Sequence, residues 1–204
     1  HAVWVIASLA EPFPPLGLRY ARSTDGGLTW QAMTLAEGPY DEPAISTCAS
    51  PQVHVVWSGT EDDRYKFHRW SDDNGATWQE PWFLEGGGGL LGIPDLVCDQ
   101  VGTLHWLTAI DDFSISYESG LPRSALYHLS LLNGAWTPGE VVLREVQGAG
   151  TNMRNVCADV NLRNQLLTVV AQPLPLGSSP NFEVFFTSKD LGGPELQPIA
   201  LQEP

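Results

Sequence analysis

Short apolar runs bounded by turn-forming residues recur along the whole chain. Four of them, rich in Val, Leu and Trp, cover residues 1–7, 53–58, 104–107 and 166–170. Each is followed by a run in which aromatic or apolar residues alternate with polar ones, at residues 18–23, 65–71, 125–130 and 182–188. Short runs between clusters of Gly, Pro, Asn and Asp are typical of β-strands. Since no longer stretch has the 3.6-residue spacing of an amphipathic helix, the pattern predicts an all-β fold.

An octapeptide pattern, S-x-D-x-G-x-T-W, follows the second run in two of the four places. Its five fixed residues would match by chance at on the order of 10⁻⁷ per position, so two copies indicate an internal repeat. We expect the aspartate to accept backbone N–H groups, the glycine to take a positive φ and the Trp to cover apolar surface. Partial copies follow at residues 130–136, one residue shorter, and at 188–192. The complete copies consist of Ser23, Asp25, Gly27, Thr29 and Trp30, and of Ser71, Asp73, Gly75, Thr77 and Trp78.

The repeat divides the chain into units at residues 1–42, 43–93, 94–151 and 152–204. Units of roughly 40–50 residues with about four antiparallel strands are typical of the blades of a β-propeller. A β-sandwich is the alternative, but its strands need no repeated turn. The first unit starts at its second strand and the last ends mid-repeat. We therefore expect a segment of a larger propeller, of roughly six blades or more, completed by missing chain or another subunit.

Composition narrows the classes of partner. The formal net charge of -14 and the pI of about 4.5 disfavour nucleic acid, because such a surface repels phosphates. No run of apolar residues is long enough to span a membrane. The five His are scattered and no cofactor motif is present, so we expect neither a metal site nor a cofactor. The odd number of cysteines predicts buried, small hydrophobic residues rather than a disulfide framework, at Cys48, Cys98 and Cys157.

The octapeptide resembles the Asp-box, or BNR repeat, of the sialidase superfamily and related propellers. The resemblance spans nearly the whole chain and implies a β-propeller with its boxes on the blade periphery, away from the active site. It also implies an extracellular or periplasmic protein. Sialidases, xyloglucan-cleaving endoglucanases, sorting receptors and photosystem assembly factors all carry this box, so the resemblance does not determine function.

A functional site is expected at the blade end opposite the boxes. The links that share the box end are short, at residues 49–52, 100–102 and 161–164. The other links are long, including residues 9–17, 37–42, 59–64, 111–123, 145–154 and 172–180, and long loops on a rigid scaffold usually carry binding residues. Residues 41–45 are similar to the stretch that holds the family's Glu partner of its nucleophilic Tyr, which makes Glu42 the candidate. The candidate catalytic residues are Glu42, Asp111, Asp112 and Tyr117, and the candidate substrate-binding residues are Asp41, Asp62, Asp63 and Arg154.

Three functions are compatible with these residues. The first is an extracytoplasmic binding module that engages a glycan or a protein through the long-loop face. The second is a sialidase-like glycoside hydrolase using the carboxylates of that face. The family's Arg-Ile-Pro motif is replaced by Gly92-Ile93-Pro94, so the set of arginines that binds a sialic acid carboxylate is incomplete in this segment. The third is a structural subunit of a larger complex, in which the carboxylates form a solvated acidic rim.

Overall fold

The computed structural model describes residues 1–10, 14–48, 50–59, 66–84, 93–111, 124–144, 154–174 and 181–192. Every regular element within these ranges is a β-strand, and the strands form four antiparallel sheets in chain order. The predicted all-β class is therefore confirmed. Within a sheet, most strands that are neighbours in sequence pair with each other, because their links let the chain turn straight back.

The sheets are numbered here in chain order. The first contains β1 (Ala2–Ala7), β2 (Pro15–Arg22) and β3 (Gln31–Glu37). The second contains β4 (Tyr40–Thr47), β5 (Val53–Gly59), β6 (Lys66–Ser71) and β7 (Trp82–Leu84). The third contains β8 (Asp95–Cys98), β9 (Leu104–Asp111), β10 (Ser124–Leu132), β11 (Ala135–Trp136) and β12 (Glu140–Arg144), and the fourth contains β13 (Arg154–Val160), β14 (Gln165–Leu174) and β15 (Asn181–Asp190).

The predicted number of about four strands per unit is found in the second sheet, and the other sheets differ from it. Within the described residues, the first and fourth sheets have three strands. In the third sheet, β11 and β12 both pair with β10, so its outer strand is interrupted. The long link predicted at residues 37–42 is wrong, because only Gly38 and Pro39 separate β3 from β4.

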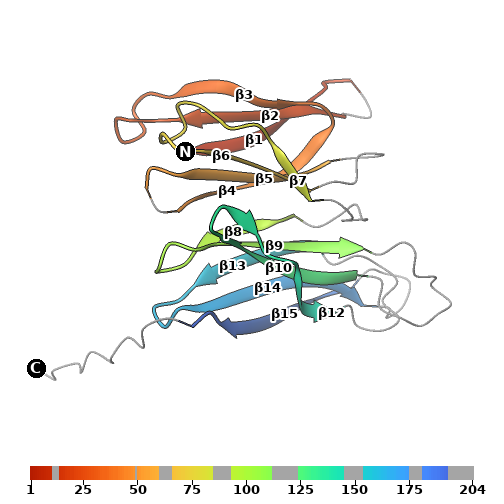
Figure 1. The fold of residues 1–204 in the computed structure, drawn as a ribbon. Coiled ribbons are helices and arrows are strands. Elements are labelled where there is room, and N and C mark those ends of the chain that lie inside the picture. Colours follow the sequence, from red (N-terminus) through yellow and green to blue (C-terminus); the bar gives the residue numbers. More distant parts are fainter. Residues whose placement is uncertain are drawn as a thin grey trace, which may run out of the picture.

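The four sheets lie one above another in chain order, from β1–β3 to β13–β15 (Figure 1). An apolar cluster fills each space between successive sheets. Because successive side chains of a strand point to opposite faces, one strand contributes to two clusters. Val55 of β5 packs with Leu18 and Tyr20 of the first sheet, whereas Val56 packs with Leu96 of the third. The core is thus a series of interfaces between sheets.

The two octapeptide turns have the same hydrogen-bond network. Asp25 Oδ1 accepts from Thr29 N at 2.9 Å, and Asp25 Oδ2 accepts from Thr29 Oγ1 at 2.6 Å. Asp73 accepts from Thr77 in the same way, at 2.8 and 2.7 Å. The predicted role of these carboxylates within the turn is therefore confirmed. The predicted positive φ is also confirmed, at 93° for Gly27 and 79° for Gly75.

The short links lie at the same end of the sheets as these turns, on the left in Figure 1. Asn74 N, in the second octapeptide, donates to Pro51 O at 2.8 Å. Gln100 N donates to Asn164 Oδ1 at 3.4 Å, which joins the corresponding links of the third and fourth sheets. The expectation that boxes and short links share one end is confirmed, and we call it the box end.

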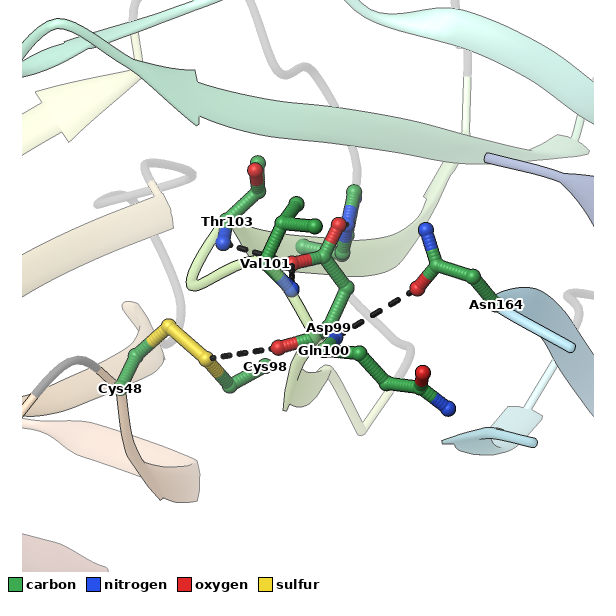
Figure 2. The surroundings of a disulfide bond; sticks show 8 residues. Cys48, Cys98, Asp99, Gln100, Val101, Thr103 and Asn164 are labelled. Atoms are coloured by element: carbon green, nitrogen blue, oxygen red, sulfur yellow. Dashed lines mark hydrogen bonds and ion pairs between the residues drawn. A yellow bond between two sulfur atoms is a disulfide. The ribbon is translucent and has the colours of Figure 1, made fainter. Parts of the chain in front are cut away.

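A disulfide bond joins Cys48 to Cys98 at the box end, with the two Cα atoms 5.3 Å apart (Figure 2). The expectation of three unpaired, buried thiols is therefore wrong. The separation of 50 residues is close to one repeat, which places the two residues at neighbouring positions of successive sheets, where β4 packs against β8. Cys157 is the free cysteine, and it is exposed rather than buried.

Candidate functional site

Strand pairing defines equivalent positions in the four sheets. Tyr20 pairs with Val3 in the first sheet, His68 with Val56 in the second and His128 with Leu107 in the third. The short links support the same alignment, because equivalent backbone bonds close them: Cys48 N to Gln52 O, Asp99 N to Thr103 O and Asn161 N to Gln165 O. Tyr20, His68 and His128 therefore occupy one column of positions, each on the face that meets the next sheet.

Each member of this column forms a hydrogen-bonded pair with a histidine of the adjacent strand. His54 Nδ1 lies 3.0 Å from His68 Nε2, and His105 Nδ1 lies 2.9 Å from His128 Nε2. In the first sheet, His1 Nδ1 lies 2.6 Å from Tyr20 Oη. The sequence predicted strand positions for His54 and His105, and the structure places both in buried positions of β5 and β9.

Burial makes the histidine pairs neutral at pH 7. Desolvation lowers the pKa of His54 to about 4 and that of His128 to about 4. Desolvation, with a smaller contribution from His54, lowers the pKa of His68 to about 3. Neutral imidazoles donate through one nitrogen and accept through the other, so each pair has a direction.

The indole of Trp136 sets the direction of the second pair. Trp136 Nε1–H can only donate, and it lies 3.1 Å from His68 Nδ1. His68 therefore donates through Nε2 to His54 Nδ1, which leaves His54 with its proton on Nε2. This His54 Nε2–H is buried and has no hydrogen-bond partner. A buried donor without a protein partner is rare, and His54 Nε2–H can donate to an acceptor atom of a ligand.

At the first interface, the octapeptide turn of the second sheet fills the space beside the Tyr20 pair. His1 Nε2 lies 3.0 Å from Asn74 Oδ1, and the ring of Trp78 packs edge-on against Tyr20 at 4.8 Å. A Cβ placed on Gly75 would lie only 1.7 Å from Tyr20 Oη. No space remains here for a ligand. The predicted covering role of the Trp is confirmed for Trp78.

At the second interface, the turn is one residue shorter and the equivalent space is open. A Cβ placed on Gly134 would meet nothing within 4 Å. The result is a cavity of about 290 Å³ between the second and third sheets. Its lining is mainly aromatic and includes the histidine pair described above. The lining residues are Gln52, His54, His68, Trp70, Trp82, Leu131, Gly134, Ala135 and Trp136.

The third interface contains an equivalent cavity of about 290 Å³ with a polar lining. His105 Nε2 lies 3.3 Å from Asp99 Oδ2, and Lys189 Nζ lies 3.3 Å from His128 Nδ1. Ser130 Oγ is 3.1 Å from His105 Nδ1, so serine, histidine and aspartate follow one another as in a hydrolase triad. However, the Lys189 ammonium can only donate to His128 Nδ1, so the His128 proton is on Nε2 and is donated to His105 Nδ1 at 2.9 Å. No nitrogen of His105 is then free for the serine proton.

The sequence-predicted site residues lie at the other end of the sheets. Asp41 and Glu42 are near the start of β4, where Asp41 Oδ1 accepts from Glu42 N at 2.8 Å. Asp111 is the last residue of β9 and Arg154 the first of β13. Asp62, Asp63, Asp112 and Tyr117 lie outside the described residues. The joint catalytic site at that end thus stays a prediction.

Sequence reasoning did not identify the aromatic cavity. His54, His68 and Trp70 lie in the predicted strands at residues 53–58 and 65–71, and nothing in those runs indicates a shared cavity. The one-residue deletion in the third octapeptide was visible and marks the cavity, because the missing residue leaves the space unfilled. In the described part of the chain, no group of three or more His, Cys, Asp or Glu could hold a metal ion. That part also contains no helix long and apolar enough to cross a bilayer.

No protein-family model matches the chain, and no curated protein matches it in sequence. Among solved structures, a point mutant of the NanB sialidase from Streptococcus pneumoniae is similar, with a TM-score of 0.55 and 13% sequence identity. The similarity covers 78% of this chain, which spans about 25% of the length of that sialidase chain. At this identity the likeness is one of fold, and this chain has a sialidase-like fold.

Proposed function

We propose that the four sheets are blades of a sialidase-like β-propeller and that the cavity between the second and third sheets binds a neutral carbohydrate. The observation that carries the proposal is the cavity lining, which includes three tryptophans and His54, whose Nε2–H is buried and has no protein partner. Apolar walls with a few fixed polar groups are typical of small-ligand sites. A cavity of about 290 Å³ can hold one sugar ring of a longer glycan.

The chemistry of the lining favours a pyranose. The C–H face of a sugar ring is apolar and stacks on indole, while its hydroxyl groups need hydrogen-bond partners. A hydroxyl oxygen can accept from His54 Nε2–H. Gln52 also lines the cavity. Since its Nε2 donates to Asp72 Oδ1 at 3.0 Å, its side-chain carbonyl oxygen is the atom that can accept from another hydroxyl. The net charge of -14 favours a neutral sugar over an anionic one.

An extracytoplasmic location is part of the proposal. Disulfide bonds persist in oxidising compartments and are rare in the cytosol. The Cys48–Cys98 bond and the sialidase-like fold both support a secreted or periplasmic protein that meets glycans outside the cell.

Trp82→Ala tests the site. Trp82 lies on the outer strand β7 and is 38% exposed, so its truncation is expected to leave the fold intact. Tryptophan fluorescence and calorimetry measure the affinity for a panel of neutral oligosaccharides. The affinity of Trp82→Ala is expected to be about tenfold or more lower than that of the wild type. Trp30→Ala is the matched control, because Trp30 is half exposed in the first octapeptide and does not line the cavity. Equal affinities for wild type and Trp82→Ala would rule out this cavity as the site.

A second candidate function is glycoside hydrolysis through Glu42. Glu42 has a positive φ of 55° at an irregularity in the pairing of β4 with β5. The equivalent residue of the fourth sheet is Asn155, with a φ of 45°. Asparagine tolerates this conformation, whereas glutamate is strained by roughly 1 kcal/mol. Such strain at a non-glycine residue points to a role for its side chain.

Two variants separate strain from chemistry at this position. Glu42→Asn is expected to raise the free energy of unfolding by up to about 1 kcal/mol. Both Glu42→Asn and Glu42→Gln are expected to abolish release of fluorophore from sialoside or glucoside substrates. Absence of turnover by the wild-type protein would eliminate this second candidate and leave the binding proposal standing.

A further inference from the structure

Three histidines occupy equivalent positions in the first three sheets. They are His1, His54 and His105. Each stands two residues before the strand residue that pairs with the column member of its own sheet. In each sheet Nδ1 of this histidine is hydrogen-bonded to the side chain of that column member. The opposite nitrogen, Nε2, can therefore be compared among the three interfaces.

At the first and third interfaces, Nε2 of this histidine faces a side-chain oxygen of the protein. His1 Nε2 lies 3.0 Å from Asn74 Oδ1, which can only accept, so His1 carries its proton on Nε2. His105 Nε2 lies 3.3 Å from Asp99 Oδ2. Burial lowers the pKa of His105, and the contact with Asp99 opposes this shift. In both sheets the histidine points its N–H at an acceptor that the protein provides.

The second interface lacks the acceptor that Asp99 supplies at the third. Cys48 occupies the position of Asp99, because each of the two residues closes the short link of its own sheet. Their backbone N–H groups donate to Gln52 O and to Thr103 O, respectively. The sulfur of Cys48 is bonded to Cys98, and a cysteine sulfur is at most a weak acceptor. This position therefore offers no oxygen to the histidine of the second sheet.

The acceptor that Asn74 supplies at the first interface is missing as well. Its counterpart in the third sheet is Asn133, since each stands three residues after the serine of its turn and has a positive φ, 58° and 53° respectively. The turn that contains Asn133 is the shortened copy, beside which the cavity is open. Among the described residues, His54 Nε2 has neither a hydrogen-bond partner nor an ion-pair partner.

We propose that the bound sugar supplies this missing oxygen, and that His54 thereby selects sugars with a hydroxyl or ether oxygen at one fixed position of the ring. His68 and Trp136 are positioning residues for that contact. Trp136 Nε1–H donates to His68 Nδ1 at 3.1 Å, and His68 Nε2–H donates to His54 Nδ1 at 3.0 Å, which holds the His54 proton on Nε2. This role rests on carbohydrate binding in the cavity and adds the atom that the cavity recognises.

Proton–nitrogen correlation NMR of the ligand-free protein tests the positioning. At pH 7, His54 and His68 are both expected to be neutral, with the proton on Nε2. Trp136→Phe keeps a ring against His68 but removes the donor, so both imidazoles are expected to populate both tautomers. Trp70→Phe is the matched control. Trp70 stacks on His68 with ring centroids 5.3 Å apart, and this contact does not depend on an indole N–H, so the tautomers should not change.

Monodeoxy sugars test the recognition. The probes are methyl glucopyranoside, methyl galactopyranoside and the monodeoxy analogue of each at every hydroxyl position, with affinities from NMR titration. Loss of the recognised hydroxyl is expected to lower the affinity of the wild-type protein by at least about tenfold. His54→Phe keeps a ring but has no donor, so this loss is expected to disappear in that variant. His54→Gln can accept from His68 and donate to the sugar, and it is expected to restore the discrimination.

The outcomes separate the recognised atom from the site itself. A His54 proton on Nδ1 in the wild-type protein would overturn the proposal. So would losses that are the same for wild type and His54→Phe at every hydroxyl, and binding that Trp82→Ala still weakens would then leave the carbohydrate site standing. Absence of sugar binding by the wild-type protein would overturn both proposals. If circular dichroism shows that His54→Phe is unfolded, His54→Gln and the wild-type tautomers decide.

Discussion

The repeated aspartates are structural residues whose acceptor oxygens are already used. Hydrogen bonds from the Thr29 hydroxyl, the Thr29 backbone and Ser23 lower the pKa of Asp25 to about 2. The equivalent bonds, led by the Thr77 hydroxyl, hold the pKa of Asp73 well below its usual range. A carboxylate that stays ionised and fully engaged within its own turn is a poor general acid at neutral pH. Both residues therefore stabilise the turn.

Gly75→Ala and Gly27→Ala are a matched pair, because both glycines occupy the same position of the octapeptide with positive φ. A Cβ on Gly27 meets nothing within 4 Å, so this variant loses only the backbone preference, roughly 1 kcal/mol. A Cβ on Gly75 collides with Tyr20, which adds about 1–3 kcal/mol. Urea unfolding checks the difference. Equal losses for the two variants would contradict the packing of this turn against the first sheet.

At the scale of elements, alternation of polar and apolar residues was sufficient to predict the strands. The alternation arises because successive side chains of a strand point to opposite faces. The second strands of the first two units, predicted at residues 18–23 and 65–71, correspond to β2 and β6. The strand numbers of the first, third and fourth sheets and the Cys48–Cys98 bond were not predicted correctly. Both depend on which strands lie beside each other in the stack, and that information is not contained in any local pattern.

The cavity shows the same limit for function. The octapeptide predicted a hydrogen-bonded turn, and both complete copies form one. The copy in the second sheet also packs against Tyr20. Where the copy is one residue shorter, a space of about 290 Å³ opens beside His54 and His68. The deletion is visible in the sequence. Its position beside the buried pair of His54 and His68 is visible only in the structure, where the second sheet packs on the third.

At the scale of the whole molecule, the interfaces contain neutral histidines where a stack of sheets normally holds apolar residues. Hydrogen bonding within each pair offsets the desolvation of the imidazoles. Protonation would place a charge between two sheets, next to a second imidazole. The first three sheets each contain such a pair or its Tyr20 equivalent. We therefore expect acid to lower the stability of the whole fold rather than to affect one site.

This gives a prediction for stability against pH. The unfolded chain has histidine pKa values near 6.5, whereas His54, His68 and His128 have values of about 4, 3 and 4 when folded. Between these limits the unfolded chain binds more protons, so the free energy of unfolding falls as pH falls from 6.5 to about 4. Each histidine contributes a slope of at most about 1.4 kcal/mol per pH unit. Burial raises the pKa of Asp95, whose contribution therefore runs in the opposite direction.

His68→Gln isolates one part of this slope, because glutamine keeps a hydrogen-bonding side chain and does not titrate. Urea unfolding at intervals between pH 4.5 and 7 is expected to give a shallower dependence for this variant, with a loss of stability at pH 7 from imperfect packing. Leu28→Gln is the control, because Leu28 is 85% exposed in the first octapeptide turn and does not titrate, so the slope should be unchanged. A wild-type stability that stays constant or rises towards pH 4.5 would show that the pairs are not held neutral between the sheets.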